Sequence, residues 1–246
     1  MKTSIITITY DRDLEYLKYN LQSIKKFCKG YHENIVVIDD HENDCKKTQE
    51  YLESIGQKYY INREAKFIKH GYIRQQYMGY YMDKYCSPDT EYVCCVDSDN
   101  IFTESHSPDV YFVDNLPVMG MQRWDQMPNT SFKKSTDNIL KWTSEHNFMR
   151  RMPLIYRIDL FSEIRAYLQN IHQLSIEYIF KDIDWCAEYC IWGDYEYKFH
   201  KKKYYWIDTV AQKDLWKQLK LPCIQYSSKQ DNSRYIDISD FKNILN

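Results

Sequence analysis

The residues with the clearest capacity for chemistry are two aspartates, Asp97 and Asp99, which follow the apolar run Y-V-C-C-V at 92–96 with only Ser98 between them. Two extended residues span about 6–7 Å, so the carboxylates repel each other unless water or a cation relieves the repulsion. A hard divalent cation such as Mg²⁺ or Mn²⁺ suits them, because it is usually held by one or two protein carboxylates together with substrate phosphates. A solvated turn is the alternative for this D-x-D pattern.

The elements before this pair alternate between strands and helices. Apolar, β-branched runs predict strands, and helical spacing of apolar residues predicts helices. The predicted strands are 4–9, 34–38, 58–61 and 92–96, and the predicted helices are 14–24, 44–55 and 71–85. This alternation is typical of a mostly parallel sheet with helices on both faces, and runs such as I-V-V-I suit strands that are buried on both sides.

Polar clusters follow three of the predicted strands. They are Thr9-Tyr10-Asp11-Arg12, Asp39-Asp40 and Asp97-Ser98-Asp99. Ligands of such sheets bind beyond the carboxyl ends of the strands, so we expect the three clusters to lie along one edge and to form the ligand site.

The second half of the sequence is less regular. We expect a strand at 118–121, a loop at 125–134, an extended M-P-L-I-Y at 152–156 and a helix at 158–168. The segment 181–199 predicts one long helix or two short ones, since Gly193 interrupts it, and late strands are expected at 203–207 and 223–226. The absence of a repeat or a Gly/Ser linker favours a single domain whose second half wraps over the first.

Composition limits the class of protein. The chain has 246 residues, 43% hydrophobic and 28% charged, which is typical of a globular protein. Its formal net charge of −2 argues against nucleic-acid binding through bulk positive charge. The eight cysteines form no C-x-x-C pair, the first residues lack a signal-peptide core, and no apolar run approaches the ~18 residues of a membrane span. We therefore expect a reduced cytoplasmic protein without a transmembrane segment, in the host cytoplasm if the chain is virus-encoded.

Several motifs together resemble the nucleotide-sugar glycosyltransferases of the GT-A fold, in particular small bacterial and viral members with a D-x-D motif. They are S-I-I-T-I-T-Y-D-R, I-V-V-I-D-D, G-Y-I-R-Q-Q-Y-M, Y-V-C-C-V-D-S-D-N-I-F, and later M-P-L-I-Y and A-E-Y-C-I-W-G-D-Y. The resemblance implies one GT-A-like, Rossmann-like α/β domain over 1–246, with a nucleotide-binding half at 1–102 and an acceptor and catalytic half at 103–246.

The resemblance also implies roles for individual residues. Thr9, Tyr10 and Arg12 would contact the uridine-type base and ribose, with Asp11 as a helix cap. Asp39 or Asp40 would contact the base, unless they form an Asx-turn. Arg74 and Gln75 would reach phosphate or sugar, and a surface salt bridge is the alternative for Arg74. Asp99 would bind the metal directly, Asp97 would meet ribose or the metal, and Ser98 lies with the donor; His200 is the candidate third ligand, or else an ordinary surface histidine.

The implied reaction is transfer of a hexosyl or pentosyl group from a nucleoside-diphosphate sugar, UDP-sugar favoured, to a hydroxyl of a glycan, glycoprotein or glycolipid. Mn²⁺ or Mg²⁺ would neutralise the leaving diphosphate. Inversion requires a base, and Glu188 is the candidate because its aromatic neighbours favour a raised pKa. Asp184 and Asp194 are the reserves, and a surface glutamate is the alternative. Trp124 and Trp192 are candidates for stacking on acceptor sugars, or else core residues.

Three other functions fit parts of the pattern. A sugar nucleotidyltransferase would bring a glycine-rich loop after the first strand, and I-T-I-T-Y-D-R has no glycine. A haloacid-dehalogenase-type phosphatase places its D-x-D at the start of the domain, whereas here it follows three strand–helix units. A non-enzymatic carbohydrate-binding protein that kept the fold is the third, since fold alone does not determine function.

Overall fold

A five-stranded sheet forms the centre of the protein in a computed structural model that describes residues 1–40, 45–150, 152–219 and 222–225. Its strand order is β3-β2-β1-β4-β9. The first four strands are parallel, and β9 pairs antiparallel with β4 at one edge. Their bounds are β1 Thr3–Thr9, β2 Asn34–Asp39, β3 Tyr59–Asn62, β4 Tyr92–Asp97 and β9 Leu154–Arg157. The predicted parallel arrangement is therefore confirmed.

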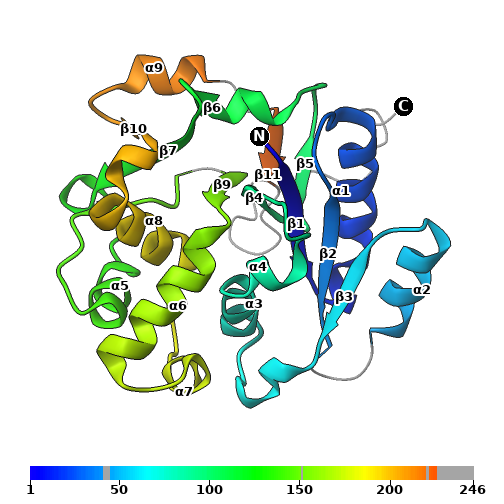
Figure 1. Cartoon of the computed structure of the whole chain (residues 1–246), viewed down its shortest axis with the longest axis horizontal. Helices are drawn as coiled ribbons and strands as arrows, with labels where there is room; N and C mark the ends of the chain where they lie inside the picture. Colours follow the sequence, from blue (N-terminus) through cyan, green and yellow to red (C-terminus); the bar gives the residue numbers. More distant parts are fainter. Residues whose placement is uncertain (41–44, 151, 220–221, 226–246) are drawn as a thin grey trace.

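Helices cover both faces of this sheet (Figure 1). Because side chains alternate along a strand, Ile5 faces α1 (Leu14–Phe27) and α2 (Lys46–Ser54), while Ile6 and Ile8 face the other side. That other side is covered by α3 (Gly71–Gly79), α4 (Met82–Tyr85), α6 (Asp159–His172) and α8 (Glu188–Phe199). The strands are thus buried on both faces, as their continuous apolar runs predict.

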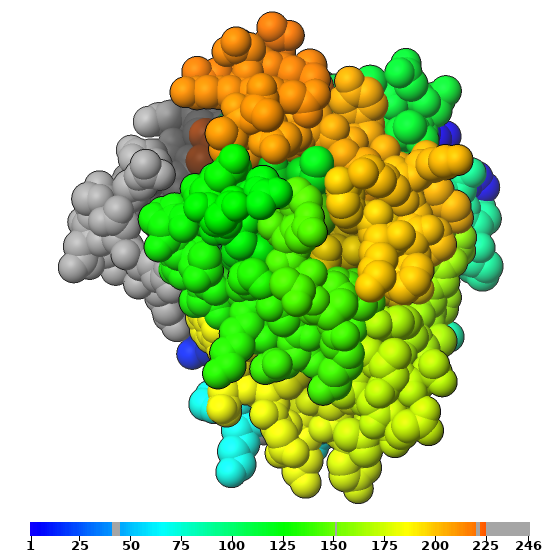
Figure 2. Space-filling model, turned by 90° about the vertical axis from the view of Figure 1, so that its left-hand side faces the viewer, coloured from blue at the N-terminus to red at the C-terminus, as the bar shows by residue number. Residues whose placement is uncertain are grey.

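The second half of the chain packs against the α3 side and makes up most of the coloured surface in Figure 2. It contributes β9 to the central sheet and forms a second sheet of order β10-β7-β6, with β8 paired to β7; β11 pairs with β5. These strands are β5 Asn100–Phe102, β6 Phe112–Val113, β7 Leu116–Arg123, β8 His146–Asn147, β10 Tyr205–Asp208 and β11 Cys223–Gln225. The remaining α-helices are α5 Lys133–Leu140, α7 Ile176–Lys181 and α9 Lys213–Gln218.

Three helical predictions need correction. The helix predicted at 71–85 is divided into α3 and α4, and α5 begins at Lys133, at the end of the predicted loop. The segment 181–199 contains the end of α7 and the whole of α8, and Gly193 lies inside α8 instead of interrupting it. A Cβ on Gly193 would lie 2.4 Å from Cβ of Phe148. The glycine is therefore required by close packing and does not mark a break.

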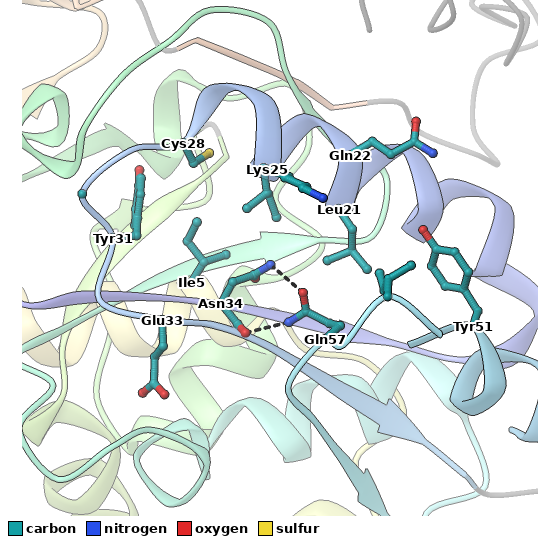
Figure 3. A pocket seen from close by; sticks show the side chains of 13 residues that line it. Ile5, Leu21, Gln22, Lys25, Cys28, Tyr31, Glu33, Asn34, Tyr51 and Gln57 are labelled. Carbon is teal, nitrogen blue, oxygen red and sulfur yellow. Dashed lines mark hydrogen bonds between the residues drawn. The ribbon is translucent and has the colours of Figure 1, made fainter. Parts of the chain in front are cut away.

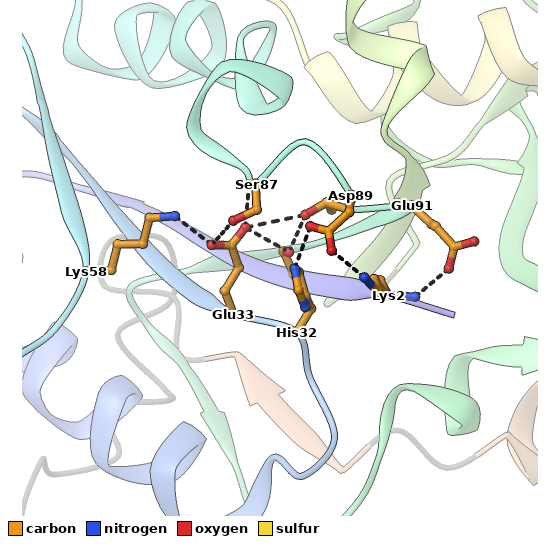
Figure 4. Close-up of polar contacts among 9 residues, drawn as sticks. Lys2, His32, Glu33, Lys58, Ser87, Asp89 and Glu91 are labelled. Carbon is orange, nitrogen blue, oxygen red and sulfur yellow. Dashed lines mark hydrogen bonds and ion pairs between the residues drawn. The ribbon is translucent and has the colours of Figure 1, made fainter.

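The amino-terminal edge of the sheet is fastened by a polar network around Glu33 (Figure 4). The Glu33 carboxylate accepts from Nζ of Lys58 at 2.6 Å and from the backbone N–H of Ser87 at 2.7 Å. Asp89 accepts from Nζ of Lys2 and lies 3.0 Å from Nε2 of His32. These contacts join β1, β2 and the loop before β4 at the edge opposite the polar clusters.

None of the helices in the described part of the chain has the length and apolar character to cross a membrane.

Candidate active site

The carboxyl ends of the parallel strands bring the predicted polar clusters to one edge. Ile8 is in register with Asp97, Thr9 with Ile38, and Asp39 with Asn62. Asp39 and Asp97 continue the alternation of Val37 and Cys95, so their side chains point to the α3 face of the sheet. The candidate site is therefore the corner between this edge and the helices α3 and α8.

Asp97 lies where α3 meets the end of β4. Nε2 of Gln75 donates to Oδ1 of Asp97 at 3.3 Å. The backbone N–H of Asp97 donates to Oδ1 of Asn100 at 3.0 Å, which fixes the turn that carries Ser98 and Asp99. The hydrogen bond from Gln75 on α3 thus holds one oxygen of the Asp97 carboxylate in place.

Glu188 reaches the same corner from the first turn of α8. Its side chain is buried, and burial raises the pKa of the Glu188 carboxyl to about 8, with a further contribution from the negative charge of Asp97. A carboxylate at a helix amino terminus is ordinarily favoured by the helix dipole, so desolvation and Asp97 outweigh that effect here. The raised pKa agrees with the sequence-based expectation, and it gives Glu188 a strong affinity for a proton.

A buried hydrogen-bonded pair positions Glu188. Nε2 of Gln76 donates to the carbonyl oxygen of Cys186 at 2.8 Å, and the Cys186 thiol donates to Oε1 of Gln76 at 2.7 Å. Because Gln76 follows Gln75 on α3, one turn of this helix holds both Asp97 and the segment that leads into Glu188. The sequence gives no sign of this link, since the two partners are far apart in the chain.

Two arginines flank the amino terminus of α3. Arg74 is buried, and its Nε donates to Oδ2 of Asp39 at 2.8 Å while Nη1 donates to the carbonyl oxygens of Ile68 and Lys69. A Cβ on Gly71 would lie 3.4 Å from Nη2 of Arg74 and 3.6 Å from Nη2 of Arg12. Both guanidinium groups therefore meet beside this glycine, and Arg12 also lies over the ring of Tyr10, 4.3 Å from its centroid. Two guanidinium groups at a helix amino terminus make an anion-binding corner.

Other residues that were predicted to bind the nucleotide-sugar donor are buried or have partners within the protein. Thr9 is buried on the α1 face, and Asp40 is 1% exposed and accepts from Nε of Arg63 at 2.7 Å. We therefore leave both side chains out of the proposed donor contacts. Asp11 is a helix cap, but for α2: its Oδ1 accepts from the backbone N–H and the hydroxyl of Thr48. Ser98 donates to Oδ2 of Asp13 at 3.3 Å, which ties the D-x-D turn to the end of β1.

His200 does not join the carboxylates. It follows the last residue of α8, twelve residues after Glu188, so about 18 Å of helix separates the two. Its Nε2 lies 3.0 Å from the carboxylate of Glu163. Glu163 in turn pairs with Arg157, which is in register with Tyr92 at the opposite end of β4 from Asp97. The prediction of His200 as a third metal ligand is therefore not carried into the proposed site.

The tryptophans expected to stack on sugars also need correction. Trp192 and Trp124 are both buried, and Trp192 packs against Gly79, Tyr80 and Tyr156 in the core. The reserve base Asp194 is likewise buried and accepts from Nε1 of Trp142 at 2.8 Å; burial raises the pKa of Asp194 to about 6. Asp184, the other reserve, lies on an exposed segment between α7 and α8.

A partly exposed row of three aromatic rings stands beside the site instead, and the sequence reasoning missed it. The ring of Trp185 stacks on Tyr72 at 4.7 Å and on Phe132 at 5.2 Å between centroids. Burial and then the nearby charge of Glu188 raise the pKa of Tyr72, so the row begins close to the candidate base. The spacing of Tyr72 and Gln76, one helical turn apart, was the available signal that both face α8.

The carboxylates of Asp97 and Asp99 suit a hard divalent cation whose remaining ligands come from a substrate. Asp97 ends β4 and Asp99 lies in the turn before β5, so the two carboxylates stand two residues apart at the end of one strand. Within the described ranges, no group of three His, Cys, Asp or Glu side chains is arranged to hold a metal. Mg²⁺ and Mn²⁺ fit such a site, because they take one or two carboxylates and obtain further ligands from phosphates and water.

A separate pocket of about 530 Å³ lies on the α1 face (Figure 3). Ile5 and Leu21 line its apolar part, and Asn34 and Gln57 are joined across it by hydrogen bonds of 2.7 and 3.3 Å. Asn34 is the first residue of β2, so this pocket lies toward the amino-terminal end of the strand. It is distinct from the corner that holds Asp97 and Glu188.

Comparison with known proteins supports the fold. No protein-family model matches the sequence, and no curated protein matches it significantly. Among solved structures, the apo form of the glycosyltransferase GlyE of Streptococcus pneumoniae TIGR4 is similar over 100% of this chain, with 12% identity and a TM-score of 0.50. This chain spans 60% of that protein. An active-site mutant of LgtC is similar over 98% of this chain and 94% of its own, with 10% identity and a TM-score of 0.57.

Both neighbours are nucleotide-sugar glycosyltransferases with a GT-A-like fold. The chain therefore has the GT-A-like α/β fold that the sequence predicts.

Proposed function

We propose that this chain is a metal-dependent glycosyltransferase. It transfers a sugar from a nucleoside-diphosphate sugar, UDP-sugar favoured, to a hydroxyl group of a glycan, protein or lipid, with inversion at the anomeric carbon. The observation that carries the proposal is that neighbouring residues of α3, Gln75 and Gln76, bind Asp97 and the segment that leads into the buried Glu188. Two arginines flank the start of the same helix. The GT-A-like fold of the solved neighbours supports it.

The negative diphosphate of the nucleotide-sugar donor matches the positive charge of the two arginines at the start of α3. Nη2 of Arg74 and Nη2 of Arg12 approach the same glycine, at the amino terminus of α3, where a diphosphate would be favoured by both cations and the helix dipole. Arg74 is held by Asp39, so its fork is oriented before the donor arrives. Tyr10 lies at the end of β1 and has its ring against Arg12. We assign Tyr10 and Arg12 to the nucleoside side and Arg74 and Gln75 to the diphosphate and sugar.

Asp97 and Asp99 would hold the divalent cation. When bound, the cation supplies positive charge that neutralises the diphosphate leaving group. It would also relieve the repulsion between the two aspartates that their spacing creates. We assign only these two carboxylates as protein ligands of the cation. The phosphates of the nucleotide-sugar donor provide further ligands.

Glu188 acts as the base in the proposed transfer. The acceptor hydroxyl gives its proton to the Glu188 carboxylate, and its oxygen forms a bond to the anomeric carbon. The bond from that carbon to the β-phosphate oxygen breaks, and its electron pair leaves with the diphosphate beside Arg74. Because the pKa of Glu188 is about 8, most molecules carry the proton on this carboxyl at pH 7, and the transfer proceeds from the fraction that has lost it. In that ionised form, a carboxylate with a raised pKa is a stronger base toward a hydroxyl proton than an ordinary carboxylate is.

A nucleotide screen tests the proposal. Thermal stability is measured with Mn²⁺ and UDP, GDP or dTDP, and nucleotide release is then followed with the matching sugar donors. We expect stabilisation by a nucleoside diphosphate only when Mn²⁺ or Mg²⁺ is present, and slow release of nucleotide from its sugar. Stabilisation by free phosphate analogues alone would indicate a phosphatase. Consumption of a nucleoside triphosphate with release of pyrophosphate would indicate a nucleotidyltransferase, and no response to any nucleotide would indicate a binding protein.

A further inference from the structure

A groove of about 540 Å³ lies between α5 and α7, on the second half of the chain. Ser135 and Asn138 line it from one face of α5, Tyr178 lines it from α7, and Asp182 and Trp185 line it from the segment that follows α7. Tyr178 is 63% exposed and Trp185 is 44% exposed, although large aromatic side chains are usually covered. Two aromatic side chains that remain open in one groove indicate a binding surface.

Trp185 connects this groove to the candidate active site. Its ring lies in the stacked row with Tyr72 and Phe132. Tyr72 stands on the first turn of α3, close to Glu188, and Trp185 also lines the groove. A molecule that lies along the row therefore has one end beside Glu188 and the other in the groove.

The lining has the chemistry that a carbohydrate requires. A sugar ring has an apolar face of C–H groups, which packs on aromatic rings, and a rim of hydroxyl groups, which need donors and acceptors. Tyr178 supplies an open ring for the apolar face, next to the exposed part of the stacked Trp185. Ser135, Asn138 and Asp182 supply donors and acceptors for the hydroxyl groups. Lys134 and Lys141 oppose Asp182 and Asp184 in the same lining, so the groove carries no excess of one charge. This balance favours a neutral occupant.

The size of the groove favours an acceptor longer than one sugar. Its volume falls in the range of about 300–1,000 Å³ that holds drug-sized ligands, and a single ring beside Glu188 would leave it empty. We infer that the groove between α5 and α7 binds a neutral oligosaccharide, whose terminal hydroxyl lies at Glu188 and whose following sugars pass the exposed part of Trp185 and pack on Tyr178. This inference rests on the proposed function, because it identifies the acceptor of that reaction.

Binding to glycans without any nucleotide tests the inference. The full chain is applied to an array of immobilised neutral glycans from monosaccharides to hexasaccharides, and the affinity of a retained tetrasaccharide is then measured by titration. We expect retention that increases from one sugar to several, and a loss of affinity of about tenfold or more in Trp185→Ala and in Tyr178→Ala. Phe199→Ala is the matched control: Phe199 is 49% exposed, lies at the far end of α8 from Glu188, and should leave glycan affinity unchanged.

Several results would overturn the inference. They are no retention on any neutral glycan, equal affinity in the wild type and both groove variants, or binding to anionic lipid vesicles or to peptides in place of glycans. Trp185→Ala is accompanied by Tyr178→Ala because Tyr178 lies outside the stacked row, so its removal does not disturb the row.

The same samples are tested for stabilisation by UDP and Mn²⁺. Glycan retention without a nucleotide response would contradict the glycosyltransferase and leave the groove assignment standing. A nucleotide response without glycan retention would contradict the groove assignment alone.

Discussion

Glu188 and Asp97 come from distant parts of the chain, yet the charge of Asp97 helps to raise the pKa of the buried Glu188 to about 8. Asp97 ends the fourth strand, and Glu188 begins α8. Gln75 and Gln76, neighbours on α3, bind Asp97 and the backbone before Glu188 respectively. The fold therefore sets a group suited to cation binding beside a group suited to accepting a proton.

Replacement of Glu188 separates binding from transfer. Glu188→Gln should keep Mn²⁺-dependent nucleotide binding within about twofold and lower the transfer rate by about 10²–10⁴-fold, the usual contribution of a general base. Nucleotide affinity by titration and nucleotide release at saturating donor and acceptor measure the two effects. Glu50→Gln is the control, because Glu50 is an exposed carboxylate on α2, on the other face of the sheet, and its replacement should retain activity. Full turnover in Glu188→Gln would remove Glu188 from the mechanism.

The raised pKa of Glu188 also predicts how stability depends on pH. Below pH 4.5 the carboxyl is protonated in the folded and unfolded states alike, so it has no effect. Between pH 4.5 and about pH 8 the unfolded state loses the proton and the folded state keeps it, so the free energy of unfolding falls by up to about 1.4 kcal/mol per pH unit. Above about pH 8 the free energy of unfolding has fallen by the full amount and does not decrease further through Glu188.

Glu188→Gln should therefore match the wild type near pH 5 and exceed it in stability at pH 8.5. Urea unfolding with a chelator present measures the difference at the two pH values. Asp97→Asn should reduce the pH dependence of the wild-type chain without abolishing it, since burial is the larger cause and remains. A Glu188→Gln variant with the same pH dependence as the wild type would show that Glu188 titrates normally.

The D-x-D pair predicts loss of metal-dependent binding. Asp99→Ala should abolish the Mn²⁺-dependent part of nucleotide binding while the melting temperature without ligand stays within a few degrees of the wild type. His200→Ala is the matched control: it pairs with Glu163 at the far end of α8, so Mn²⁺–nucleotide affinity should not change. Calorimetric titration with and without Mn²⁺ measures both variants. Unchanged affinity in Asp99→Ala, or lost affinity in His200→Ala, would contradict the metal assignment.

Sequence patterns predicted the sheet and the edge that carries the site, because apolar runs that end in polar residues report directly on buried strands. They also predicted a raised pKa for Glu188 from its aromatic neighbours, with a surface glutamate as the alternative, and the buried carboxyl has that raised pKa. They did not predict which face each edge residue occupies. Thr9 shares its face with Thr7 and is covered by α1, whereas Asp97 faces α3; this difference depends on which helix covers which side.

The limits of α8 explain the other differences. Because the helix begins at Glu188, Trp192 lies one turn inside it and enters the core, while Trp185 lies before it and stays exposed. His200 is at the other end of the same helix, so its apparent closeness to Glu188 in sequence becomes a separation along the axis. Apolar spacing locates the helix in the sequence, but it does not show the contacts that Gln76 makes with Cys186 before the helix and Phe148 makes with Gly193 inside it.

The two arginines beside Gly71 allow binding to be separated from stability. Arg74→Met should weaken nucleotide binding and also destabilise the protein by about 3–5 kcal/mol, because it leaves the buried carboxylate of Asp39 without its cation. Arg12→Ala should weaken nucleotide binding by a similar factor with little change in stability, because Arg12 is exposed and lies on the surface of Tyr10. Arg74→Met combined with Asp39→Leu removes both charges and should recover most of the stability without recovering binding. Nucleotide titration and urea unfolding measure the two quantities; normal nucleotide affinity in the Arg12 and Arg74 variants would place the diphosphate away from the start of α3.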